Sequence, residues 1–190
     1  GALRVLGTAD APVVITSLQD DSYGGDTNGD GMCDPGNASS TAACPAPGDW
    51  HSIAVGPTSV STMFEHVIVR YGAACNLCGG FPFAAIKVEG ATVAIADAVF
   101  EKNRAFGLWL ANSASTTVAS SVFRGHRLTS GGASSIGLVL ENSSVTLDGV
   151  AFSDNDIGIA ASGASAVTVG SGGVTFDANT TDDLPADLIP

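Results

Sequence analysis

One short pattern recurs along the chain and limits what it can fold into. Short apolar segments end in a phenylalanine at Phe100, Phe123, Phe152 and Phe176, which are 23, 29 and 24 residues apart. A Gly-Leu or Gly-Ile step recurs between them, at Gly107, Gly137 and Gly158. A repeat of about 20–30 residues with three short apolar segments is typical of a solenoid. One such unit cannot bury its own apolar face, so stacked units share a core.

The segments within each repeat have the alternation of strands. In Val145–Leu147 and Val167–Val169, apolar residues alternate with threonine, which is a period of two. Three strands per turn, with glycine and asparagine near the corners, predict a right-handed parallel β-helix in a single all-β domain spanning residues 1–190. Asn103, Asn155 and Asn179 follow the phenylalanine strands. We expect them to take left-handed backbone at one corner and to stack their amides between coils.

The first part of the chain repeats more loosely. Segments 61–72 and 49–55 fit one coil, and segments 3–7 and 12–18 fit another, incomplete one. This gives about six coils and a rod about 30 Å long at the usual spacing of about 4.8 Å between strands. The chain starts within a coil, and open β-helix ends are unpaired sheet edges. We therefore expect flanking domains of the same chain, or identical subunits, to stack on the ends.

The charge of the chain restricts its partners. Seven basic residues oppose 19 acidic ones, for a net charge of −12. So few cations form no patch that neutralises several phosphates, which excludes nucleic acid and an anionic membrane surface as partners. The longest uncharged runs, 105–123 and 157–176, are rich in serine, threonine and glycine, so we expect no membrane insertion. An acidic chain can recruit cations, or its charge can simply keep a secreted protein soluble.

The segment Ala11–Gly72 resembles the β-helical repeats of large bacterial and archaeal surface proteins, in the pectin-lyase-like superfamily. The residues that carry the resemblance are 12–18, 20–31, 47–50 and 66–72. The resemblance implies surface display, adhesion or glycan contact, outside the cell or on its surface. We therefore expect a non-enzymatic structural or adhesive module, part of a larger surface protein or of an end-to-end assembly. A polysaccharide-binding or lyase-like module is the alternative.

Residues 20–48 interrupt the repeat with a pattern typical of calcium loops. Oxygen-bearing side chains alternate along the loop and a glycine follows, which curls the backbone around a hard cation. The expected Ca²⁺ ligands are Asp21, Asp26, Asn28, Asp30, the carbonyl of Met32, and Asp34. The pattern resembles the loops of dockerins and thrombospondin type 3 repeats, but its twelfth position is Asn37 instead of glutamate. The same residue types also favour metal-free turns.

Four cysteines lie in two loops. Cys33 and Cys44 lie in the insertion, and Cys75 and Cys78 lie in a second loop, 73–82. Both loops follow equivalent strands and should leave the same corner of the β-helix. Three disulfide pairings are open, with Cys33–Cys44 and Cys75–Cys78 favoured over pairing between the loops, and a four-thiolate zinc site is the rival. An even count of cysteines indicates an oxidising compartment.

Few residues suggest chemistry on a polysaccharide. The aspartates do not recur at matching offsets, as the paired carboxylates of a hydrolase would. Trp109 alternates with leucines, so it should point outward, where it can stack on a sugar or cover a neighbouring strand. Arg124 and Arg127, together with His126, could form a small cationic ledge for an acidic sugar, or pair with Glu101 and Asp154.

Overall fold

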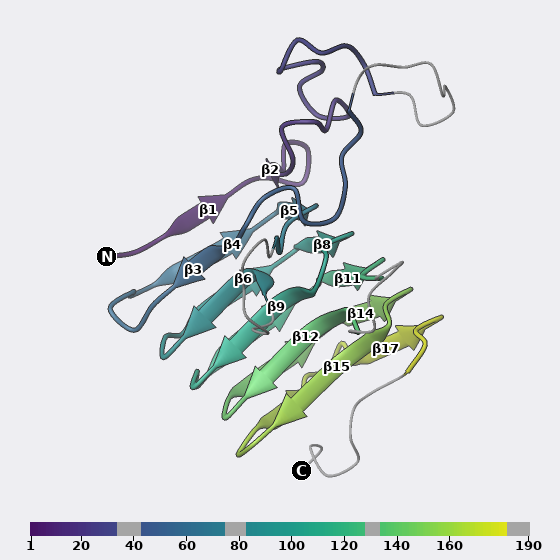
Figure 1. Cartoon of the computed structure of the whole chain (residues 1–190). Coiled ribbons are helices and arrows are strands. Elements are labelled where there is room, and N and C mark those ends of the chain that lie inside the picture. The colour runs from purple at the N-terminus through teal and green to yellow at the C-terminus, as the bar shows by residue number, and fades with distance from the viewer. Residues whose placement is uncertain (34–42, 75–82, 128–133, 182–190) are drawn as a thin grey trace.

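The computed structural model describes residues 1–33, 43–74, 83–127 and 134–181, and these form a right-handed parallel β-helix. The described residues form seventeen strands in three sheets, and all pairs of these strands are parallel (Figure 1). The described residues form no helix, so none forms a helix that could cross a membrane. Because two sheets have six strands and one has five, the prediction of about six coils is confirmed.

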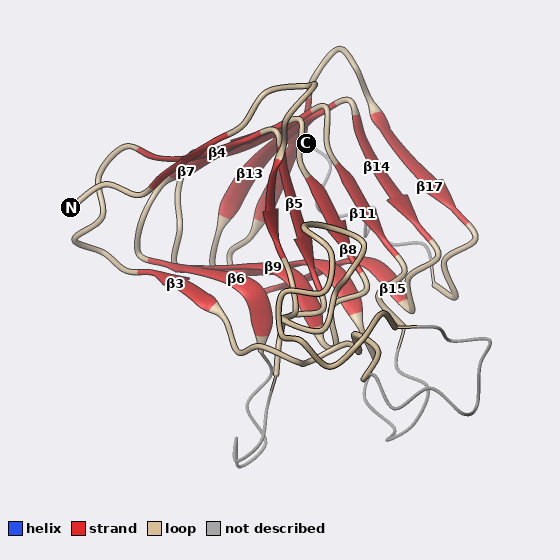
Figure 2. Cartoon of the chain, turned by 90° about the horizontal axis from the view of Figure 1, so that it is seen from above, coloured by secondary structure: helices blue, strands red, loops and turns tan. Residues whose placement is uncertain are grey.

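The first sheet has the order β1-β4-β7-β10-β13-β16. Its strands are Arg4–Leu6, Thr62–Glu65, Val93–Ala96, Thr116–Ala119, Ser144–Asp148 and Ala166–Val169. The second sheet contains β2 (Val13–Ile15), β5 (Val67–Arg70), β8 (Val99–Glu101), β11 (Val122–Arg124), β14 (Val150–Ser153) and β17 (Val174–Asp177). The third contains β3 (Ile53–Val55), β6 (Ala84–Glu89), β9 (Phe106–Ala111), β12 (Ile136–Glu141) and β15 (Ile157–Ser162). Seen along the axis, the sheets enclose the core (Figure 2).

Inward side chains stack in rows along the axis, as the period-two pattern predicts. The four repeating phenylalanines occupy one row in register on β8, β11, β14 and β17. Their rings stack with centroids 4.7, 5.0 and 5.4 Å apart. Phe100, Phe123 and Phe152 are fully buried. This continuous apolar column is the shared core that a single coil cannot build by itself.

The corners use left-handed backbone, but not at the residues the sequence indicated. At the corner after the second sheet, the residue that directly follows each strand of this sheet from β5 to β17 has a positive φ: Tyr71, Lys102, Gly125, Asp154 and Ala178. The asparagines come one residue later and have no positive φ. The expectation of left-handed backbone at Asn103, Asn155 and Asn179 is therefore wrong. The residue before each asparagine makes the turn, which leaves the amide free to bond between coils.

Candidate functional site: the loop-bearing corner

The polar groups of the corner after the second sheet form a ladder along the axis. Asn103 Oδ1 accepts a hydrogen bond from the Gly72 amide at 2.8 Å, and its Nδ2 donates to the Val69 carbonyl at 3.1 Å. Asn155 and Asn179 repeat this pattern, each bonding the coil before it. Each asparagine thus joins its own coil to the preceding one, so the predicted stacking of these amides is confirmed.

His126 takes the place of an asparagine in this ladder. Its side chain is fully buried, with Nδ1 2.8 Å from Asn155 Oδ1 and Nε2 3.2 Å from Asn103 Nδ2. An acceptor faces Nδ1 and a donor faces Nε2, so the neutral imidazole protonated on Nδ1 satisfies both. Burial lowers the pKa of His126 to about 4. A buried neutral imidazole offers no charge at the surface, so His126 adds nothing to a cationic ledge of Arg124 and Arg127.

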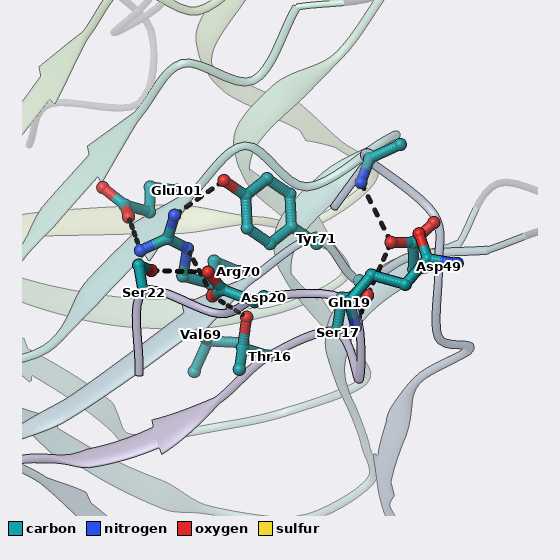
Figure 3. Close-up of polar contacts among 12 residues, drawn as sticks. Thr16, Ser17, Gln19, Asp20, Ser22, Asp49, Val69, Arg70, Tyr71 and Glu101 are labelled. Atoms are coloured by element: carbon teal, nitrogen blue, oxygen red, sulfur yellow. Dashed lines mark hydrogen bonds and ion pairs between the residues drawn. The ribbon is translucent and has the colours of Figure 1, made fainter. Parts of the chain in front are cut away.

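Arg70, at the end of β5, lies at the centre of a buried charged cluster (Figure 3). Its guanidinium donates to the Tyr71 hydroxyl at 2.6 Å and lies 3.3 Å from both Glu101 Oε1 and Asp20 Oδ2. The rings of Tyr71 and Tyr23 lie within cation–π distance, 4.6 and 5.5 Å from the guanidinium carbon. This cluster therefore ties the start of the insertion to the coil beneath it.

Asp20 is held in its ionised form by its neighbours. Burial by itself would raise the pKa of Asp20. The hydroxyls of Ser22 and Thr16 donate to its carboxylate, and the charge of Arg70 lies close by. Together these contacts hold the pKa of Asp20 below its usual range. A carboxylate that is already bonded in this way is not available to a ligand.

The two ends of the insertion are fixed side by side. Asp49 accepts a hydrogen bond from the Ser17 hydroxyl at 2.6 Å and one from the Ala46 amide at 2.9 Å (Figure 3). Trp50 donates from its ring nitrogen to the Arg70 carbonyl at 2.7 Å. A Cβ atom at Gly72 would lie 2.5 Å from the Trp50 ring, so only glycine admits this ring. The insertion thus leaves and rejoins the β-helix at one point without disturbing the register of β2 and β5.

The structure shows how the predicted calcium ligands lie. The carboxylate of Asp26 accepts hydrogen bonds from the Gly29 and Gly31 amides at 2.7 and 3.0 Å, which curls the loop. Asn28 Oδ1 accepts from the Asp30 amide at 3.3 Å. No three histidine, cysteine or acidic side chains of the described residues gather at one point. Asp34 lies outside the described residues, and the Met32 side chain is 60% exposed.

Among the described acidic residues of the insertion, Asp21 is distinguished by a buried carboxylate oxygen without a hydrogen-bond partner. Its Oδ2 accepts a hydrogen bond from the Cys33 amide at 2.6 Å. Its Oδ1 is buried without a hydrogen-bond partner, and the residue is only 8% exposed. A buried carboxylate oxygen without a donor is costly. Asp21 also lines a cavity of about 320 Å³ with Asp20, Ser22, Met32, Cys33, Pro45, Arg70 and Tyr71.

Cys33 and Cys44 form a disulfide with their Cα atoms 5.0 Å apart, as the sequence predicts. Because two of the four sulfurs are bonded to each other, the alternative of a four-thiolate zinc site is wrong. Cys75 and Cys78 lie outside the described residues, so their pairing stays a prediction.

The residues considered for glycan contact do not form one site. Trp109 lies on the outer face of β9 in the third sheet, with the Lys87 ammonium 4.5 Å from its ring centre. Arg124 lies on the second sheet and forms an ion pair with Glu101 at 2.7 Å. Arg127 pairs with Asp154 at 2.7 Å and donates to the Ala178 carbonyl. Both arginines are engaged within the molecule, which is the pairing that the sequence offered as the alternative to a ledge.

The sequence reasoning missed the Arg70 cluster, although a signal for it was present. Arg70, Glu101 and Arg124 occupy one outward row in register, directly after Val69, Phe100 and Phe123. Alternating charge at one repeat position predicts an ion ladder between neighbouring strands. Aligning the repeats by the phenylalanine row would therefore have found it.

No family model, curated protein or solved structure matches the chain. The fold defines the class, which is an all-β parallel solenoid of three sheets.

Proposed function

We propose that this chain is a non-enzymatic structural or adhesive module of an extracellular or cell-surface protein, of the pectin-lyase-like kind. The observation that carries the proposal is that the ionisable groups of the loop-bearing corner bond other groups of the same chain. Arg70, Arg124 and Arg127 bond carboxylates and carbonyls of their own chain, and His126 is buried as a neutral group. These contacts support a rigid corner. The Cys33–Cys44 disulfide agrees with an oxidising compartment.

The location and the role can be tested in the source cells. Protease added to intact cells should remove the chain, and an intracellular marker should survive the same treatment. Antibody against the chain should label intact cells. A chain that survives until the cells are lysed would contradict the proposal.

The module is proposed to be stabilised by calcium bound in the insertion. Asp26, Asn28 and Asp30 form the turn expected of such a loop, and the unpartnered Oδ1 of Asp21 offers a further anionic oxygen close to Cys33. The Met32 carbonyl and Asp34 complete the proposed ligand set. Oxygen ligands of this type suit Ca²⁺. A cation near Asp21 would satisfy a buried oxygen that has no hydrogen-bond donor.

Calcium should therefore raise the melting temperature of the purified chain. A ligand at about 100 times its dissociation constant stabilises the folded state by about 2.7 kcal/mol. Asp26→Asn and Asp21→Asn should each weaken the calcium response, measured by thermal melting with added Ca²⁺ and with a chelator. Asp10→Asn, at an exposed residue outside the insertion, is the matched control. A melting temperature that calcium leaves unchanged in the unsubstituted chain would contradict the site.

Polysaccharide binding or cleavage is the second candidate, and Trp109 favours it. Its ring is only partly buried and carries the Lys87 ammonium on one face. Affinity electrophoresis in gels containing anionic or neutral polysaccharide should show retardation that Trp109→Ala removes. Lyase activity would appear as new unsaturated ends in an anionic polysaccharide. Unchanged migration in every gel and no new ends would eliminate this candidate.

A further inference from the structure

Each of the three sheets ends in one strand from the first coil and one from the last coil. The pairs of edge strands are β1 and β16, β2 and β17, and β3 and β15 (Figure 1). All strands of a sheet run in the same direction, one coil after another. Moving a copy of the molecule along the axis therefore brings β1, β2 and β3 onto β16, β17 and β15 with parallel pairing kept. Two copies facing each other through the same end would instead need antiparallel pairing.

The inward rows of the core also run from one end to the other and stop there. One row is Val5, Phe64, Ile95, Val118, Leu147 and Val169. Its central members are buried, with exposed fractions of 1% or less, but Val169 is 39% exposed. A second row runs from Ile15 to Phe176, and both of these terminal residues are half-buried. Apolar residues that are covered in every central coil are thus uncovered in the first and last coils.

The edge strands of the last coil carry little of the charge that usually protects an exposed edge. Natural edge strands are blunted by lysine, proline or inward charges. Asp177 is the single charged residue in strands β15, β16 and β17. Thr181 pairs with Ile157 at the very start of β15. At the other end, the insertion leaves from the corner after β2 (Figure 1). Among the described residues, the end members of the inward rows remain partly exposed at both ends.

We propose that the last coil binds the first coil of a second copy of this chain, so that the β-helix continues head to tail. This inference rests on the proposed structural role and names the partner. Val169 would then contact Val5 of the next copy, and Phe176 would contact its Ile15. The apolar residue at the end of each row would then be covered by the apolar residue at the start of the same row in the next copy. A heterologous contact of this kind does not close, and it generates a filament.

An outward row gives the proposal a test that does not disturb the core. This row runs from Arg4 through Met63, Ala94, Thr117 and Thr146 to Thr168. Stacked copies therefore bring Arg4 of one copy beside Thr168 of the other, as directly neighbouring positions on the outer face. Both residues are exposed in the single chain, so substitutions there leave the fold intact.

The experiment is sedimentation velocity over micromolar to millimolar concentrations, at about 0.15 M salt, where the screening length is about 8 Å. The unsubstituted chain should form species larger than the monomer as concentration rises. Thr168→Arg should raise the dissociation constant about two- to fivefold, since like charges on neighbouring strands repel. Thr168→Asp should lower it by a similar factor. Arg4→Glu added to Thr168→Arg should restore association.

Thr117→Arg is the matched control, because it lies exposed in the middle of the same row and should leave association unchanged. A chain that stays monomeric at every concentration would overturn the head-to-tail contact. Association that Thr168→Arg and Thr168→Asp leave unaltered would also overturn it. Neither result alters the proposed function, which the protease treatment of intact cells and the calcium melting experiment test separately.

Discussion

At the scale of single residues, asparagine and histidine are not equivalent in the ladder of hydrogen bonds at the corner. An asparagine amide offers both an acceptor and a donor, so it bonds an amide and a carbonyl of the preceding coil. His126 instead bonds the two neighbouring amides of the ladder, Asn103 and Asn155. It stays within the ladder only as a neutral ring, because protonation would place a second donor opposite the Asn103 amide nitrogen. The ladder is therefore sensitive to acid at one position.

His126→Asn should remove an acid-dependent loss of stability. The folded pKa of His126 is about 4, below the value of 6.5 for an exposed histidine, so the unfolded chain binds more protons between these values. The contribution of neutral His126 to the free energy of unfolding is complete above about pH 6.5. It is lost as the pH falls towards about 4, and the total loss is about 3 kcal/mol. Denaturant unfolding between about pH 7 and pH 4 measures it.

His51→Asn is the control for this prediction, because His51 is exposed and lies outside the ladder. It should keep the full acid dependence of the unsubstituted chain. His126→Asn should show a flatter profile and, at neutral pH, a stability close to that of the unsubstituted chain. An equally steep acid loss in both variants would show that other groups cause it.

At the scale of elements, the sequence predicted the strands better than the corners. The period-two alternation and the phenylalanine spacing place β8, β11, β14 and β17 in register, because burial requires it. The left-handed residues were misplaced because several residue types, including Lys102 and Ala178, adopt positive φ here. Contacts between coils determine the backbone conformation at the corner, and the conformational preference of the single residue does not. The repeat indicates the row of Arg70, Glu101 and Arg124, but it does not place Asp20 and Tyr23 beside this row, because they lie in an insertion that has no repeat.

Within the strands, the recurring glycines permit close contact between coils. A Cβ atom at Gly137 would lie 2.8 Å from the Gly158 carbonyl oxygen and 2.9 Å from the Phe152 ring. Gly137→Ala should therefore destabilise the fold by about 1–3 kcal/mol through overpacking. The midpoint of denaturant unfolding measures this effect. Gly56→Ala is the control, since nothing lies within 4 Å of its Cβ position, and an equal loss in both variants would refute the explanation.

At the scale of the whole molecule, the Arg70 cluster attaches the insertion to the β-helix. Asp20 comes from the insertion, whereas Glu101 comes from β8, and Arg70 contacts both between them. Their side chains are 2%, 10% and 11% exposed, respectively, so the three charges depend on each other for compensation. The disulfide and the contacts of Asp49 hold the insertion at its other points. The residues proposed to bind calcium thus lie on a fixed base.

Arg70→Ala should cost about 3–5 kcal/mol of stability, because it leaves the buried carboxylate of Asp20 without its cation, whereas Glu101 keeps its ion pair with Arg124. It should also make the insertion more open to limited proteolysis than in the unsubstituted chain. Arg127→Ala removes an ion pair whose side chains are 41% and 63% exposed, so it should cost less than about 1 kcal/mol. Equal losses of stability in the two variants would contradict the role assigned to the buried cluster.

The direction of the hydrogen bonds between coils has a mechanical consequence. These bonds run along the axis, and the first and last coils lie at opposite ends of it (Figure 1). Tension between the two ends stretches the ladder of each coil in series, so the weakest rung sets the force that the chain withstands. We expect the coils to peel away one at a time from an end, with the greatest resistance at the Arg70 cluster, where buried ion pairs join neighbouring segments. A rod of this kind yields gradually under a pull and absorbs it as extension.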